Sequence, residues 1–278
     1  AYCEIKNIEA KEGSIMAMPI NLVLVRHGES EGNVVKEMKT EDIPLEFKER
    51  HSSLWRLTDK GVIQAIDAGN WLKGEFPAPF DQHYTSEYTR AMETAGLLNL
   101  QNATWRREFY LREREWGDLD SITHQERKTR FAESMRVKKR EPLFWIPPNG
   151  ESMTQACLRI DRVIQTLHRE CSDKNVIIVC HGEIMWGFRI RLERMSQDVY
   201  NTLDMSKHPH DRMHNCQIVH YTRRDPVTNE LSPNLNWRRS VCPWDTSLSS
   251  NVWEDVTRPK FSNNELLHTV GKVKRIVY

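Results

Sequence analysis

The sequence predicts an α/β fold, a three-layer sandwich with a mostly parallel central sheet and helices on both faces. First, the apolar runs at residues 22–25 and 175–180 have the length of strands that are buried on both faces. Second, segments with helical periodicity separate the short strand-like runs, as in α/β proteins. Third, each of the two runs leads into a His-Gly pair, and α/β sheets place their ligands at the carboxyl ends of strands.

The first half of the chain contributes two predicted strands and three helices. "INLVLV" (20–25) is the first strand, and Gly28 after it should allow a sharp turn or a close approach to a ligand. A helix that begins near Ser30 should point its free N–H groups at the same place. Thr58 is a plausible N-cap for the next helix, whose predicted buried face is Val62, Ala65, Ile66, Gly69 and Leu72. "FDQHYTS" is a short strand, followed by a helix through "TRAMETAGLL".

The second half of the chain has the clearest helix. Ser152 caps it, and its apolar face is predicted as Met153, Ala156, Cys157, Ile160, Val163, Ile164, Leu167 and Cys171. The strand "NVIIVC" (175–180) follows. After about residue 222 the periodicity decays into segments that contain Pro, Asn and Trp. We therefore expect an N-terminal tail (1–19), one α/β domain (20–222), and a C-terminal extension (223–278) that packs on the same domain and includes one hairpin at most.

Composition narrows the class of protein. The chain has 278 residues, with 40 basic and 39 acidic side chains and a formal charge of +1. This balance favours neither a nucleic-acid partner nor a membrane surface. No apolar run has the length of a membrane span, and the first residues lack the apolar stretch of a signal peptide. Six cysteines without framework spacing indicate reduced thiols and a cytoplasmic location. No oligomeric state follows from the sequence.

Reactive side chains occur in four segments near the predicted strand ends. They are Arg26, His27, Arg90, Glu113, Glu115 and His181. Arginine matches phosphoryl oxygens bidentately, and histidine can form a covalent phospho-intermediate. A protonated carboxylic acid can donate its proton to a leaving oxygen. The set therefore indicates phosphoryl transfer through a histidine.

Six ordered pieces make the resemblance specific. The chain resembles the histidine phosphatase superfamily, in its phosphoglycerate-mutase-like branch, through "RHGESEGN", "LTDKGVIQA", "TSEYTRAMETA", "LREREWG", "NGES" and "IIVCHG". The resemblance implies His27 as the nucleophile and Glu113 as the general acid. It implies phosphoryl binding by Arg26, Arg90 and His181, with Asn33 supporting the same pocket. It also implies a small phosphorylated substrate and requires neither a metal nor another cofactor.

Three alternatives remain for single features. Glu115 lies two positions from Glu113, and the family register selects Glu113. Cys180 is a rival nucleophile, but cysteine phosphatases use C-x5-R and Trp186 stands where that arginine would be. The cluster "HPHDRMHNC" has zinc-ligand residue types at His208, His210, His214 and Cys216, although its spacing fits no familiar site.

The basic run "MRVKKRE" (135–141) is either a solvated helix face or part of the pocket. In the resemblance this segment folds over the pocket mouth. If Arg136, Lys138, Lys139 and Arg140 face the pocket, they would suit a substrate with extra negative charge.

The resemblance leaves the reaction open between phosphatase and mutase. Glycolytic mutases of the family read "ERHYG" and "HGNSLR" where this chain reads "EREWG" and "HGEIMW". They also have "RRSYD" followed by prolines, which this chain lacks. We therefore expect a metal-independent phosphatase, with a phosphoglycerate-type mutase as the alternative. A non-catalytic phosphate-binding protein or scaffold is a third possibility, which the complete set of reactive residues disfavours.

Overall fold

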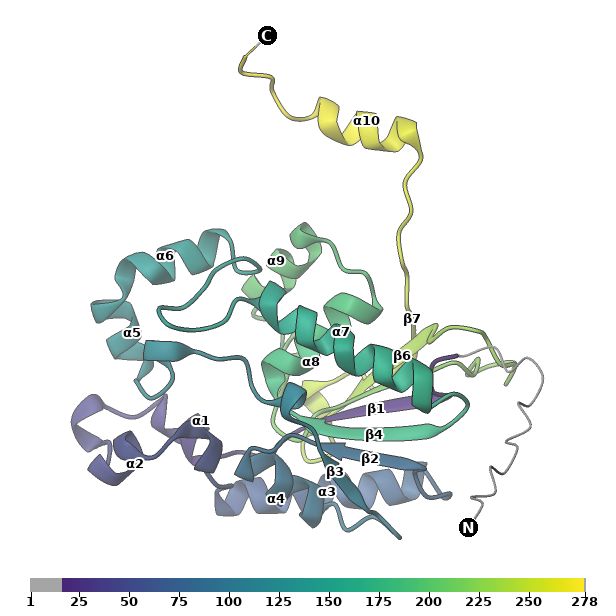
Figure 1. The fold of residues 1–278 in the computed structure, drawn as a ribbon, viewed down its shortest axis with the longest axis horizontal. Coiled ribbons are helices and arrows are strands. Elements are labelled where there is room, and N and C mark those ends of the chain that lie inside the picture. Colours follow the sequence, from purple (N-terminus) through teal and green to yellow (C-terminus); the bar gives the residue numbers. More distant parts are fainter. Residues whose placement is uncertain (1–16, 278) are drawn as a thin grey trace, which may run out of the picture.

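The computed structural model describes residues 17–277, and most of the predicted N-terminal tail lies outside this range. Within it, seven strands form one sheet in the order β3-β2-β4-β1-β5-β6-β7 (Figure 1). Strands β3, β2, β4 and β1 run parallel, whereas β5, β6 and β7 form an antiparallel end. The strands are β1 (Asn21–Arg26), β2 (Gln82–Thr85), β3 (Trp105–Arg107), β4 (Asn175–Cys180), β5 (Ile218–Thr222), β6 (Trp237–Val241) and β7 (Glu254–Asp255). The predicted α/β fold is confirmed.

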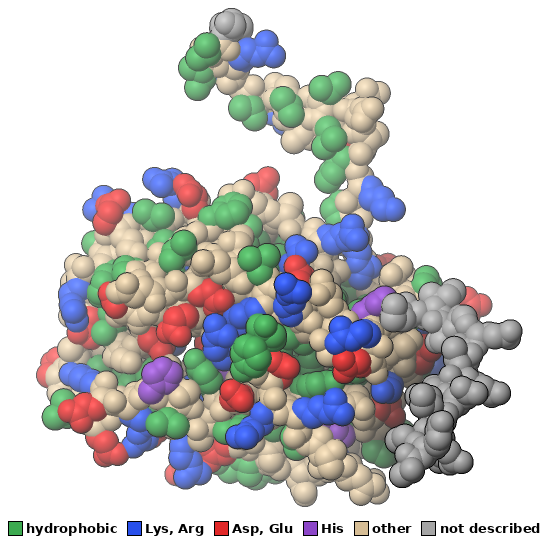
Figure 2. All heavy atoms as spheres, viewed as in Figure 1, with side chains coloured by type: hydrophobic (Ala, Val, Ile, Leu, Met, Phe, Trp, Pro, Cys, Tyr) green, Lys and Arg blue, Asp and Glu red, His purple; other side chains and the backbone are tan. Residues whose placement is uncertain are grey.

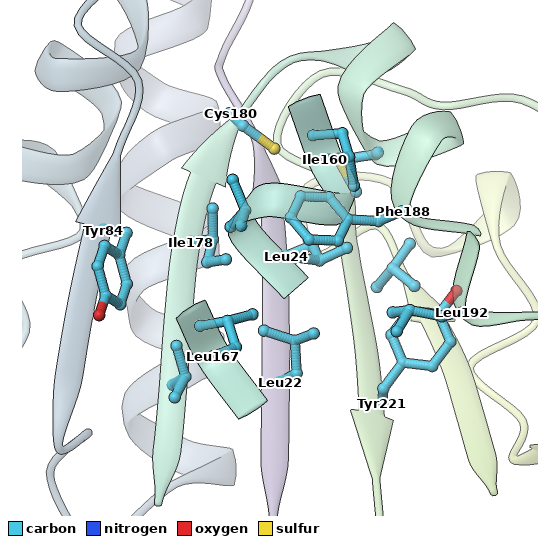
Figure 3. Close-up of a cluster of buried hydrophobic side chains, with 14 of the residues drawn as sticks. Leu22, Leu24, Tyr84, Ile160, Leu167, Ile178, Cys180, Phe188, Leu192 and Tyr221 are labelled. Atoms are coloured by element: carbon cyan, nitrogen blue, oxygen red, sulfur yellow. The ribbon is translucent and has the colours of Figure 1, made fainter. Parts of the chain in front are cut away.

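Helices cover both faces of the sheet (Figure 1). On one face lie α7 (Met153–Glu170) and α8 (Gly182–Leu192), and on the other α3 (Asp59–Glu75) and α4 (Thr89–Leu97). Leu22 and Leu24 of β1 pack in the cluster of α7 and α8, where Figure 3 shows them near Phe188. Val23 and Val25 pack in the opposite cluster. Because successive strand residues point to opposite faces, burial on both sides requires the continuous apolar run.

The helix at residues 59–75 starts at the predicted cap but buries a somewhat different face. The Thr58 hydroxyl accepts the backbone N–H of Gly61. Ile66, which we placed on the buried face, is 43% exposed, and Ala68 is buried instead. The reason is close packing: a side chain at Gly69 would come within 2.3 Å of the Leu98 carbonyl oxygen, so small residues line this contact. The predicted face of α7 is confirmed, with Ile164 only partly buried.

Further short helices surround the carboxyl edge of the sheet and the outer surface. The α-helices are α1 (Glu31–Val35), α2 (Leu45–Glu49), α5 (His124–Arg130), α6 (Ala132–Arg140), α9 (Gln197–Met205) and α10 (Asn263–Gly271). The 3₁₀ helices are Thr40–Asp42, Ser52–Leu54, Phe109–Leu111, Gly117–Leu119, Pro209–Asp211 and Thr246–Leu248. Helices α5 and α6 occupy the segment between "LREREWG" and "NGES".

The C-terminal segment contributes to the sheet and then leaves the body. Strand β6 pairs with β5 and β7 pairs with β6. The sequence after residue 222 therefore contains two strands that hydrophobic periodicity did not predict. Beyond them, residues 259–277 are exposed, and α10 stands apart from the body with apolar side chains on its surface (Figure 2). No helix within residues 17–277 is both long enough and apolar enough to cross a membrane. The five cysteines in this range are buried free thiols.

Candidate active site

Three parallel strands bring their carboxyl ends to one place. Arg26 at the end of β1 pairs in register with Cys180 at the end of β4, and Thr85 at the end of β2 pairs with Val179. The residues that follow these strands are therefore neighbours at the same sheet edge. They are His27, His181 and Ser86. The sheet, rather than any local turn, assembles the site.

His27 is held as a neutral imidazole with a defined tautomer. Its Nδ1 lies 2.7 Å from the carbonyl oxygen of Gly28, which can only accept, so Nδ1 carries the proton. Nε2 is then a lone-pair nitrogen, and it accepts the Nε–H of Arg90 at 3.2 Å. Burial lowers the pKa of His27 well below its usual value, and the positive charges of Arg90 and Arg26 lower it further. This arrangement suits a nucleophile.

His181 faces the same centre from β4. Its ring centroid lies 5.2 Å from that of His27, and its Nε2 lies 2.8 Å from the Ser86 hydroxyl. Its Nδ1 is buried and has no hydrogen-bond partner among the described residues. Burial and the nearby Arg90 lower the pKa of His181 well below the usual range. His181 does not itself line the cavity that His27 lines, so its contact with a phosphoryl oxygen stays a prediction.

Arg26 and Arg90 supply the positive charge. Both line a small inner cavity of about 40 Å³ together with His27 and Asn33. Arg26 Nη1 donates to the Met213 carbonyl at 2.5 Å, and its buried Nε has no partner among the described residues. Arg90 Nη1 donates to the Ser52 carbonyl at 2.7 Å. A cavity of this size accepts a group of a few heavy atoms, and guanidinium groups suit a phosphoryl.

Asn33 is oriented by its neighbours. Its Oδ1 accepts hydrogen bonds from Ser30 N, Ser30 Oγ and Asn215 Nδ2. The amide oxygen is thus occupied, and the amide N–H groups remain for the inner cavity that Asn33 lines. Ser30 is the N-cap of α1, as expected.

Gly28 packs closely against the start of α3, and its approach to a ligand stays a prediction. A side chain at Gly28 would come within 2.4 Å of the Gly61 carbonyl oxygen, and one at Gly61 would come within 2.0 Å of the Glu29 carbonyl oxygen. The glycine pair therefore lets the loop after β1 lie directly against the start of α3. This contact fixes the backbone that follows His27.

Glu113 stands between two cavities. It lines both the inner cavity and an outer cavity of about 270 Å³, and Arg26, Lys36 and Trp116 are the other residues shared by the two. Burial raises the pKa of Glu113, and the neighbouring Glu183 raises it further. The carboxyl group is thus biased toward its protonated form at the opening of the inner cavity. Glu115 lines neither cavity.

Several residues of the site escaped sequence reasoning. Lys36, Trp55, Trp116 and Asp120 line the inner cavity, and Ser86 contacts His181. Ser86 lies in "TSEYTRAMETA" and Trp116 in "LREREWG", the motifs that also contain Arg90 and Glu113. Their positions in these motifs could have predicted that they lie at the site. Lys36 and Trp55 come from the loop region after β1, whose path depends on tertiary contacts.

The alternative nucleophile Cys180 and the possible zinc ligands at residues 208–216 lie outside the candidate site. Cys180 is fully buried in the core cluster, and burial raises the pKa of its thiol. His210 and His214 contact backbone carbonyls of Ser247 and Pro209. Across the described part of the chain, no group of three or more His, Cys, Asp or Glu side chains could hold a metal ion.

The basic run divides between surface and pocket. Arg136 pairs with Glu133 and Arg140 with Glu141, all on exposed side chains, and Lys139 is also exposed. Only Lys138 lines the outer cavity. Of the two possibilities left open, the solvated face applies to Arg136, Lys139 and Arg140 and the pocket to Lys138, because α6 turns one face toward the cavity and the other toward solvent.

This geometry agrees with comparisons to known proteins. Residues 22–230 match the histidine phosphatase superfamily (branch 1). The chain belongs to this family. A 2,3-bisphosphoglycerate-dependent phosphoglycerate mutase of Methylorubrum populi is 30% identical over 200 residues, which cover 66% of this chain and 84% of that protein.

Solved structures share the fold. A mycobacterial glucosyl-3-phosphoglycerate phosphatase in complex with VO3 has a TM-score of 0.58 at 23% identity, covering 72% of this chain and 92% of that one. A mutant phosphoserine phosphatase from Entamoeba histolytica in complex with phosphoserine has a TM-score of 0.58 at 19% identity, covering 74% and 92%. At these identities the likeness shows the fold alone.

Proposed function

We propose that this histidine phosphatase superfamily member hydrolyses small phosphomonoesters through a phosphohistidine on His27. The observation that carries the proposal is the position of Glu113 between the two cavities. A phosphoryl group in the inner cavity would place its ester oxygen near Glu113 and the rest of the substrate in the outer cavity. The outer cavity, about 270 Å³, has room for a small molecule.

The proposed first step forms a nitrogen–phosphorus bond. His27 Nε2 attacks the phosphorus as the P–O ester bond breaks, and Glu113 gives its proton to the departing oxygen. Arg26, Arg90 and the free Nδ1 of His181 stabilise the charge on the phosphoryl oxygens in the transition state.

The second step returns the enzyme to its starting form. Water attacks the phosphohistidine, the ionised Glu113 takes one proton from that water, and inorganic phosphate leaves. His27 is again neutral and Glu113 is again protonated, so no external acid is consumed. Neither step calls for a metal ion.

A mutase is the second candidate, and the curated relatives named as mutases support it. In a mutase, a substrate hydroxyl rather than water accepts the phosphoryl group. Glu183 and Trp186, two positions where the chain departs from the mutase pattern, line the outer cavity. Because the outer cavity would hold the rest of the substrate, these two differences from the mutase pattern favour a substrate other than that of the mutases. They therefore support the phosphatase proposal.

The test is a screen of phosphomonoesters in the presence of a strong chelator. Released phosphate and isomerised phosphoester are measured separately. The proposal expects phosphate release that survives the chelator and is inhibited by vanadate. Isomers without phosphate release would make the protein a mutase, and ligand binding without either product would make it a binding protein. Activity lost to the chelator and restored by zinc or magnesium would contradict the mechanism.

A further inference from the structure

Lys36 stands at the opening between the two cavities. It is the C-cap of α1 and lines the inner and the outer cavity alike. Its ammonium group makes neither a hydrogen bond nor a salt bridge within the described residues. Desolvation and the nearby Arg127 lower the pKa of Lys36 to about 8, although Asp120 and Glu113 oppose the shift and Arg90 adds to it. An anion bound beside this ammonium would offset the cost of its desolvation.

Lys138 approaches the outer cavity from α6. It also lacks a hydrogen bond or a salt bridge among the described residues. Its stem is held by aromatic rings, with Nζ 5.2 Å from the Trp116 ring centroid and 5.8 Å from that of Trp145. Trp145 is itself anchored to α6, because its Nε1 donates to Ser134 Oγ at 3.0 Å. The ammonium group of Lys138 therefore lies beside two aromatic rings and forms no salt bridge within the described residues.

Trp116 connects the two lysines. Lys36 Nζ lies 5.9 Å from the centroid of the same ring that contacts Lys138, and both lysines line the outer cavity. Neither ammonium group forms a salt bridge within the described residues, although Lys138 is close enough to Glu183 and Asp204 for its charge to favour their ionised forms. A bound anion would therefore supply a direct partner that both lysines lack.

The other charges of the outer cavity are mostly accounted for. Glu183 pairs with Arg114 at 3.0 Å, and Asp211 accepts the Ser206 hydroxyl at 2.6 Å. Asp204 has no hydrogen-bond partner in the described range, and burial raises its pKa. Arg212 adds a further cation to the lining. Asp204 is thus a carboxyl group of the lining that a substrate anion would meet without an intervening salt bridge.

We propose that Lys36 and Lys138 together bind a second anionic group of the substrate, either a carboxylate or a second phosphoryl. This inference rests on the proposed function, because the first phosphoryl is taken to occupy the inner cavity. The enzyme would then select small phosphomonoesters that carry two anionic groups. Asp204 opposes such a ligand and limits its affinity.

The test measures binding to a His27→Ala variant, which cannot form the phosphoenzyme. One ligand pair is 3-phosphoglycerate and glycerol 3-phosphate, which differ by a carboxylate in place of a hydroxymethyl group. A second pair is the bisphosphate and the monophosphate of propane-1,3-diol. Because a hydrogen bond to a charged group has a substantial net strength, we expect a Kd about ten-fold lower for the dianionic member of at least one pair. The pair that shows it identifies the second group as carboxylate or phosphoryl.

Adding Lys138→Met should remove most of that preference while changing little the Kd of the ligand whose only anionic group is one phosphoryl. Lys139→Met is the matched control, because Lys139 neighbours Lys138 on α6 but is exposed and lies outside the cavity. Asp204→Asn should act in the opposite direction and strengthen binding of the dianionic ligand. Lys36→Met should weaken both ligands and the dianionic one more.

The outcomes separate the two proposals. Equal effects of Lys138→Met on both members of each pair, or equal effects of Lys138→Met and Lys139→Met, would overturn the anion subsite. If the parent protein releases no phosphate from any phosphomonoester but the lysine-dependent preference persists, the hydrolase proposal fails and the subsite stands as a ligand-binding site. The same comparison of KM in the parent enzyme checks that the variants remain folded and active.

Discussion

At the scale of single residues, burial sets the protonation states that the chemistry needs. Desolvation is the largest cause of the lowered pKa of His27 and of the raised pKa of Glu113. Both shifts favour the forms that the proposed chemistry uses, a neutral His27 and a protonated Glu113. The positive charges of Arg90 and Arg26 add to the effect of burial on His27 and oppose it on Glu113.

The first prediction separates Glu113 from Glu115 by leaving-group chemistry. An alkyl phosphate releases a strongly basic oxygen that needs a proton, whereas nitrophenolate leaves without one. Glu113→Gln should lose about 10²–10⁴-fold in rate on an alkyl phosphate and far less in the first nitrophenolate burst. Slow turnover after the burst would show that water activation also needs Glu113.

Glu115→Gln is the matched control for this prediction and should behave nearly like the parent on both substrates. Rapid-quench measurement of the burst is needed, because steady-state turnover mixes the two steps. If Glu115→Gln shows the leaving-group-dependent loss instead, the acid assignment is wrong by two residues.

Most of the site residues could be predicted from the sequence, because they lie at strand ends or in short motifs. Arg26, His27 and His181 could be placed together from two strand ends alone, since parallel strands share a carboxyl edge. Lys36 could not, because a lysine at the end of a five-residue helix has no local signal. Its position depends on how the loop after β1 packs, and that packing involves Gly61, more than thirty residues from His27.

At the scale of elements, the contact between α3 and the loop after β1 positions His27. Gly28 N donates to Thr94 Oγ1 and Glu29 N donates to Gln64 Oε1, so α4 and α3 both hold this loop. The close approach at Gly61 leaves no space for a β-carbon. The helical pattern predicted α3, but sequence periodicity carries no information about backbone approach at one position.

Two glycines of α3 allow a matched test of that contact. Gly61→Ala should push the loop away from α3, reduce kcat by more than ten-fold, and destabilise the fold by about 1–3 kcal/mol through overpacking. Gly74→Ala, in the same helix with no atom within 4 Å of the added carbon, should leave activity unchanged and stabilise by up to about 1 kcal/mol. Urea unfolding and steady-state kinetics of both variants decide the matter. Equal behaviour of the two would show that the loop contact is unimportant.

At the scale of the whole molecule, buried histidines link stability to pH. Burial lowers the pKa of His27 and His181 well below the usual value, and that of His220 to about 3. Below about pH 6.5 the unfolded chain protonates these imidazoles and the folded protein does not. The unfolded state then binds more protons, so stability falls as pH falls. Glu113, whose pKa is raised, has the opposite effect and offsets part of the loss.

We therefore expect the free energy of unfolding to be about 3–4 kcal/mol lower at pH 5.5 than at pH 7.5, because His27, His181 and His220 each contribute about 1.4 kcal/mol over the pH unit below 6.5 and Glu113 offsets part of the sum. His220→Gln keeps a donor for Asn21 Oδ1 and lies outside the site, so it should reduce this pH dependence by roughly one histidine's share. Urea titrations at the two pH values measure the difference. An unchanged difference in His220→Gln would contradict the assignment of that histidine.

The central claim is that His27 carries the phosphoryl group, and acid-quench trapping tests it most directly. Turnover of a labelled phosphomonoester, stopped with acid and mapped at once by peptide analysis, should place phosphate on His27 in a linkage that is labile to acid and stable to base. His27→Ala should trap none, whereas Cys180→Ser should trap as much as the parent. Label on Cys180, or label retained in His27→Ala, would contradict the account.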